Sequence, residues 1–130
     1  MYYLPQEIEV WYIIPAIRKE LSKELVKKHG MTLEEAGKAI GVSKAAVSQY
    51  MSKKRGKSIK MPKAVLEEIK TSAKNIKEKR TDAFHEIMKL LKICKIQGVG
   101  CKACKKFNKG VIERCKSNHS LYKQTYEMQE

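Results

Sequence analysis

The segment Thr32–Gly56, TLEEAGKAIGVSKAAVSQYMSKKRG, constrains the fold more than any other part of the chain. Thr32 and Glu35 match a capping box that opens a short helix, and Gly41 begins a tight turn. Gly37 puts a residue without a side chain where two helices would touch. Apolar residues recur at spacings that wedge the pair onto a core, namely Ala36, Ile40, Val42, Val47 and Tyr50. The segment therefore predicts two short helices packed at a steep angle, the second over about 43–53.

The rest of the chain also has helical patterns. Residues 7–29 carry apolar residues three or four apart, Pro62 opens a further helix, and Thr81 caps another that leads to Cys94. The sequence contains no useful run of alternating polar and apolar residues. We therefore expect an all-α fold, with a helical bundle domain over residues 1–80 and a helical, cysteine-bearing module over residues 81–130.

The charge of the chain is strongly positive and unevenly distributed. Its 28 Lys and Arg against 14 Asp and Glu give a net charge of +14. Between Lys44 and Lys63 lie seven basic residues and no acidic one. Such a field is typical of a protein that binds a polyanion, most simply nucleic acid, although a Lys-rich surface can also serve solubility.

No stretch approaches the roughly 20 apolar residues that span a bilayer. The N-terminus, MYYLPQEIEVWYII, lacks the basic start of a signal peptide. We therefore expect a cytoplasmic protein.

The residues Ile40–Tyr50, IGVSKAAVSQY, resemble the helix-turn-helix of the Cro/C1 (Xre-like) repressors. Glu7–Leu21, the core Ile40–Gly56 and the C-terminal cysteines together resemble a family of predicted archaeal transcriptional regulators. This resemblance implies a Cro/C1-like helix-turn-helix bundle that binds double-stranded DNA in a sequence-specific way, as a homodimer on two half-sites. Trp11, Tyr12 and Ile13 are candidate dimer contacts, with core packing as the alternative.

The resemblance also implies that the helix over about 43–53 enters the major groove. Gln49 can pair with adenine, Lys44 can reach guanine or phosphate, and Ala45 can touch a thymine methyl. The full set of expected base contacts is Ser43, Lys44, Ala45, Ser48 and Gln49. The expected phosphate contacts are Thr32, Lys53, Lys54, Arg55, Lys57 and Lys60.

All four cysteines lie within a short segment, with the spacing Cys94-x6-Cys101-x2-Cys104-x10-Cys115. In a reducing compartment such a group favours a metal site over disulfides. Zinc ribbons typically use two short CxxC-like pairs, and only one is present here. The first three spacings resemble those of the iron–sulfur loop in the endonuclease III family of DNA glycosylases, whose last spacer is x5. We therefore expect the four cysteines to bind a [4Fe–4S] cluster that controls DNA affinity, with structural zinc or free thiols as alternatives.

Two other classes of function are weighed against this one. An enzyme would need convergent acids or an open metal site, but the adjacent pairs Glu34/Glu35 and Glu67/Glu68 point in different directions on a helix. A bridging coactivator also joins a Cro-like helix-turn-helix to a cysteine module, but in the reverse order. We therefore expect a DNA-binding regulator that is not an enzyme, and for which no small-molecule substrate is inferred.

Overall fold

The computed structural model describes residues 4–52 and 59–107 of the 130-residue chain. Within these ranges every regular element is helical, and the prediction of an all-α fold is confirmed. The elements in chain order are α1 (Pro5–Ile8), η1 (Glu9–Ile13), α2 (Ile14–Lys23), η2 (Glu24–Lys28), α3 (Leu33–Ile40), α4 (Lys44–Met51), α5 (Lys63–Lys77), α6 (Ala83–Ile96) and α7 (Val99–Phe107). None of these helices is long and apolar enough to cross a membrane.

The first four elements form one continuous rod. The residues that join them keep right-handed helical backbone angles, and η1 and η2 are π-helical stretches within that rod. Pro15 lies in the first turn of α2 and has no N–H to donate. In the turn before it, the N–H of Ile14 donates to the carbonyl of Glu9, five residues back. A π-helical turn is thus the local adjustment that accompanies a proline in this helix.

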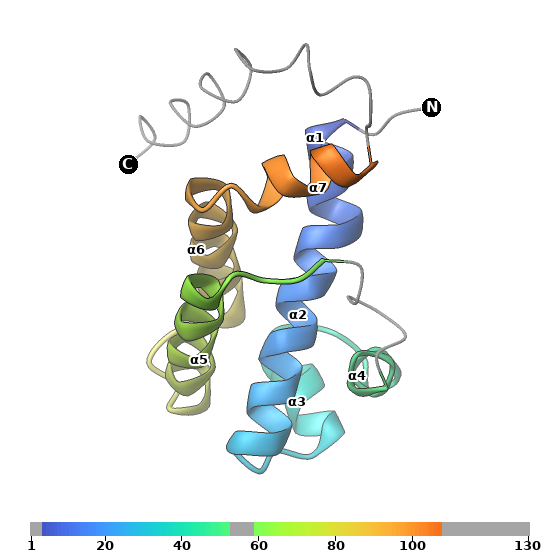
Figure 1. The fold of residues 1–130 in the computed structure, drawn as a ribbon. Helices are drawn as coiled ribbons and strands as arrows, with labels where there is room; N and C mark the ends of the chain where they lie inside the picture. The colour runs from blue at the N-terminus through green and yellow to red at the C-terminus, as the bar shows by residue number, and fades with distance from the viewer. Residues whose placement is uncertain (1–3, 53–58, 108–130) are drawn as a thin grey trace.

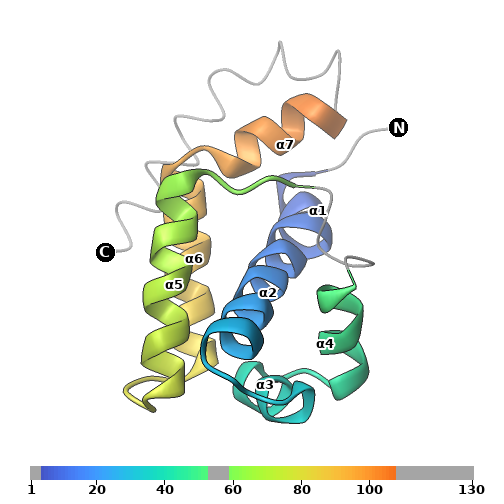
Figure 2. The same ribbon diagram turned by 60° about the horizontal axis from the view of Figure 1, so that its bottom comes forward.

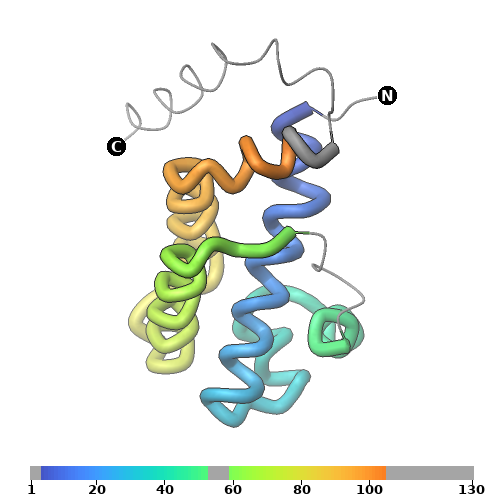
Figure 3. Tube along the Cα trace, viewed as in Figure 1, coloured from blue at the N-terminus to red at the C-terminus, as the bar shows by residue number. Residues whose placement is uncertain are grey.

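This rod is the centre of the molecule (Figure 1). The pair α3 and α4 packs on one side of it, and α5 and α6 form an antiparallel hairpin on the other side, as Figure 2 also shows. The last described helix, α7, crosses over the end of the rod that contains α1 (Figure 3). The long helix therefore connects every other part of the described structure.

One hydrophobic core runs through all of these elements. Its most buried members come from the rod, from α4, from α5 and from α6, and include Ile17, Leu21, Val47, Val65, Ile69 and Leu90. Residues on both sides of position 80 belong to this same cluster, because Cys94, Val99 and Ala103 pack in it as well. The division into two domains at residue 80 stays a prediction, and the described residues on its two sides share one core.

The three candidate dimer contacts in the first helix differ in burial. Ile13 lies in the core, Tyr12 packs against it, and Trp11 keeps 54% of its surface exposed. Core packing therefore accounts for Ile13, whereas Trp11 alone of the three is largely exposed.

Candidate nucleic-acid interface

The first helix of the pair, α3, begins with the capping box that the sequence predicts. The hydroxyl oxygen of Thr32 accepts a hydrogen bond from the N–H of Glu35 at 3.1 Å, and the N–H of Thr32 donates to Glu35 Oε1 at 3.0 Å. These two bonds satisfy backbone donors that the helix cannot satisfy itself. The bond from the N–H of Thr32 stabilises the charged carboxylate, as does the Thr32 side chain to a smaller extent, so the pKa of Glu35 lies below its ordinary value.

The turn between α3 and α4 depends on two glycines. Gly41 ends α3 with φ of +79°, a left-handed conformation that residues with a Cβ rarely adopt. A Cβ on Gly37 would lie 2.7 Å from the carbonyl oxygen of Val42 and 3.3 Å from the backbone carbon of Ser43. The two helices can approach this closely only because Gly37 has no side chain, which confirms the role that the sequence predicts for it.

The second helix, α4, is fixed at its start and along its inner face. The Ser43 hydroxyl oxygen accepts a hydrogen bond from the N–H of Ala46 at 3.1 Å, which caps the helix. Ala46, Val47 and Tyr50 are buried against the rod and α3. Because its inner face is held in this way, the outer face of α4 has a fixed orientation.

The outer face carries the five expected base contacts. Lys44, Ala45 and Ser48 are exposed, as is the capping residue Ser43, and Gln49 is partly exposed. Ser43 uses its oxygen as the cap acceptor, so its O–H is the group that remains for donation to DNA. That these side chains contact bases stays a prediction, and the structure places all five on or next to one exposed helix.

The expected phosphate contacts are only partly within the described residues. Thr32 at the start of α3 and Lys60 just before α5 are exposed. Lys53, Lys54, Arg55 and Lys57 lie outside the described residues. Beyond this segment the chain returns to the core at Met61, which is buried. The sequence interpretation did not include Lys63 among the phosphate contacts, although it belongs to the same basic run and is exposed at the start of α5.

The cysteines occupy a different part of the molecule. Cys94 lies on α6 with 1% of its surface exposed, Cys104 is buried on α7, and Cys101 on α7 is partly exposed. Cys115 lies outside the described residues. Among the residues that the structure describes, no group of three or more His, Cys, Asp or Glu is placed to hold a metal ion. The metal site therefore stays a prediction from spacing.

The surroundings of Cys94 favour a neutral thiol. Burial, followed by the nearby Glu9 carboxylate, raises the pKa of Cys94 to about 12, although Lys95 acts in the opposite direction. Lys95 Nζ forms an ion pair with Glu9 Oε2 at 3.2 Å, which ties α6 to η1. Metals bind the thiolate form and displace the thiol proton, so this raised pKa describes Cys94 in the metal-free protein.

Comparison with known proteins gives one match. Residues 23–73, from the end of α2 to the middle of α5, match the family model described as Helix-turn-helix, which covers less than half of the chain. Searches of curated proteins and of solved structures each found no match. The match and the geometry of α3 and α4 support a regulator with a helix-turn-helix that binds double-stranded DNA.

Proposed function

We propose that this chain is a sequence-specific transcriptional regulator that reads double-stranded DNA with α4 in the major groove. The observation that carries the proposal is the exposed face of α4, held in place by the Ser43 cap, by the close approach at Gly37 and by a buried inner face. The chain around this face, from Lys44 to Lys63, has no acidic residue. A rigid polar helix within a basic segment is suited to reading bases while lysines neutralise phosphates.

Each side chain on this face suggests a particular contact. Gln49 can bond to both N6 and N7 of adenine, Lys44 can donate to guanine, and the methyl group of Ala45 can pack against a thymine methyl. Thr32 directly precedes α3 and Lys60 lies shortly before α5, both are exposed, and both can donate to phosphates. The first group would determine sequence preference, and the second would add affinity without preference.

We further propose that the protein acts as a homodimer. One α4 of eight residues reads only a few base pairs, and regulators of this type gain specificity when two such helices contact half-sites one helical turn apart. The largely exposed Trp11 on the outer surface of the rod supports a contact between two copies near this point. A selected DNA site with twofold symmetry would agree with this proposal.

The test begins with selection of preferred duplexes from random DNA by the full-length protein. Gln49→Ala should then weaken binding to the selected site by about 1–3 kcal/mol and leave random DNA nearly unchanged. Lys60→Gln should weaken both DNAs equally and reduce the slope of log affinity against log salt concentration by about 1. Fluorescence anisotropy at several salt concentrations measures both effects.

Lys70→Gln is the matched control, because Lys70 is exposed on α5, a helix that packs on the other side of the rod from α4 (Figure 1). It should leave both affinities unchanged at moderate salt. If Gln49→Ala and Lys60→Gln acted alike on selected and random DNA, α4 would not be the reading helix.

A separate proposal concerns control of DNA affinity by a [4Fe–4S] cluster, or a structural role for zinc, at the four cysteines. The spacing of the cysteines supports it, and so does the position of α7, which contacts α1 and η1 at one end of the rod on which α4 also packs. Metal analysis of protein purified without oxygen should give about four irons per chain for the cluster, or one zinc. Equal DNA affinity for metal-loaded and metal-free protein at one salt concentration would exclude control by the metal.

A further inference from the structure

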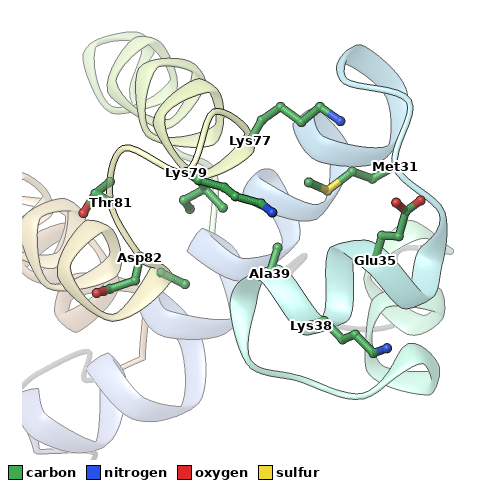
Figure 4. A pocket seen from close by; sticks show the side chains of 10 residues that line it. Met31, Glu35, Lys38, Ala39, Lys77, Lys79, Thr81 and Asp82 are labelled. Atoms are coloured by element: carbon green, nitrogen blue, oxygen red, sulfur yellow. The ribbon is translucent and has the colours of Figure 1, made fainter.

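A groove of about 660 Å³ lies between α3 and the turn that joins α5 to α6 (Figure 4). Volumes of this order are typical of small-molecule sites, at roughly 300–1,000 Å³. The apolar part of its lining is buried or partly buried and consists of Met31, Ala39, Ile76 and Ala83. The polar part consists of Glu35, Lys38, Lys77, Lys79, Thr81 and Asp82. The groove thus combines an apolar surface with a charged rim.

The two acids on the rim are already engaged in helix caps. Glu35 accepts from the N–H of Thr32, and Asp82 Oδ1 accepts from the N–H of His85 at 2.8 Å. Figure 4 shows the Asp82 carboxylate pointing away from the groove. Both carboxylates stay charged in these caps, and the charge of Lys77 also contributes to the lowered pKa of Glu35, so the net positive charge of the rim comes from three lysines against two acids.

The lysines on the rim form few close ion pairs. Within the described ranges, 4–52 and 59–107, Lys77 and Lys79 form no ion pair with a carboxylate, and Lys38 pairs only loosely with Glu34, at 3.8 Å. Figure 4 shows the Lys79 ammonium reaching toward Met31 and Ala39, over the apolar lining. The groove therefore presents positive charge next to an apolar surface.

Lys79 has this position at an energetic cost. Its φ is +58°, at the end of α5, where its N–H donates to Ile76 O at 3.1 Å and the N–H of Arg80 donates to Asn75 O at 3.0 Å. Glycine usually occupies such a left-handed helix end because it lacks a Cβ. Lysine is therefore less stable than glycine at this position of the turn. The side chain that crosses the groove is the one that this lysine carries.

We propose that this groove binds a small organic anion in which a carboxylate, sulfonate or phosphate group is joined to an apolar body. The apolar body would lie on Met31 and Ile76, and the anionic group would contact the ammonium groups of Lys77 and Lys79. The inference depends on the groove alone and not on the proposed function.

The groove and the DNA-reading pair use different faces of α3. Gly37 meets the turn to α4, whereas Glu35 and Ala39, two residues away on either side, line the groove. Residues two apart on a helix point in nearly opposite directions, so an anion in the groove leaves the exposed face of α4 uncovered.

The test compares two fluorescent probes on the full-length protein, the anion 8-anilinonaphthalene-1-sulfonate and its uncharged analogue N-phenyl-1-naphthylamine. We expect the sulfonate to bind saturably at one site. Lys79→Gly and Lys77→Gln should each raise its Kd at least about tenfold, the scale of one lost charge-assisted contact. The Kd of the uncharged analogue and the Kd of Lys70→Gln protein for the sulfonate should stay unchanged.

Lys79→Gly also separates lost binding from lost folding. It replaces a residue with a strained backbone by glycine, so it should raise the melting temperature of the protein while it weakens binding of the anion. An unchanged Kd for the sulfonate in both variants would overturn the proposal, as would equal affinity for the two probes. Competitive displacement of the sulfonate by duplex DNA would also overturn it, and would assign these lysines to DNA phosphates.

Discussion

The helix-turn-helix pair and the cysteine-bearing helices are built by different kinds of interaction. In α3 and α4, the decisive contacts join residues close in sequence, such as Thr32 with Glu35, Ser43 with Ala46, and Gly37 with Val42. In α6 and α7, the decisive contacts reach across the chain, as in the ion pair of Lys95 with Glu9. Local contacts can be read from a sequence pattern, whereas distant contacts depend on how the helices pack.

The largest expected effect tests the long-range contacts of α6. Lys95 and Glu9 keep 6% and 20% of their side chains exposed. Glu9→Gln leaves the buried ammonium without this carboxylate and should lower the free energy of unfolding by about 3 kcal/mol, measured by urea denaturation. The double variant Glu9→Gln, Lys95→Met should recover most of this loss. A single variant as stable as the parent would mean that the pair does not hold α6 to η1.

The next effect compares one substitution in the two regions. Gly37→Ala should lower the free energy of unfolding by about 2 kcal/mol, because its Cβ meets backbone at 2.7 Å, and it should weaken DNA binding. Gly100→Ala on α7 meets only Ile13 Cδ1, at 3.8 Å, and should instead raise stability by about 0.5–1 kcal/mol. Thermal unfolding of both variants measures the contrast, and the same sign for both would contradict it.

A smaller effect concerns the cap of α3. Thr32→Ala should lower stability by about 1 kcal/mol, whereas Thr71→Ala in the interior of α5 should raise it by about 0.5 kcal/mol. Because the pKa of Glu35 is lowered in the fold, its charged carboxylate stabilises the fold at pH values above the ordinary pKa. This stabilisation is lost as the pH falls through the lowered pKa. Denaturation of Glu35→Gln at neutral and acid pH should therefore show a difference from the parent that shrinks in acid, because only the parent loses a charged carboxylate there.

Near neutral pH the thiols should have the smallest effect on stability, because Cys94 is a neutral thiol in the folded and in the unfolded chain. Of the three cysteines that the structure describes, iodoacetamide should label Cys101 first and Cys94 last in metal-free protein, as followed by mass spectrometry. The same burial makes stability depend on pH. Since the pKa of Cys94 is raised to about 12, the contribution of its neutral thiol to stability is fully present below the ordinary thiol pKa. That contribution is lost as the pH rises toward about 12. Early labelling of Cys94 would show that α6 opens readily.

The accuracy of sequence interpretation follows the same division. The capping box, both turn glycines and the buried face of α4 were predictable because each depends on neighbours within a few residues. The groove was not predictable, because its walls come from residues 31–39 and 76–83, which only packing brings together. The burial of Cys94 was missed for a related reason. A cysteine spaced for metal binding and a cysteine that faces the core of a helix bundle look the same in the sequence.

The all-α class, the helix-turn-helix and the basic segment around it follow from the order of the residues, because helix caps, glycines and charges act through neighbours or through composition. Only packing shows that α6 and α7 share the core of the rod, that Glu9 meets Lys95, and that Lys79 reaches over an apolar groove. The physical reason is that burial and ion pairing depend on which helix faces meet, and that choice is made by the whole core at once.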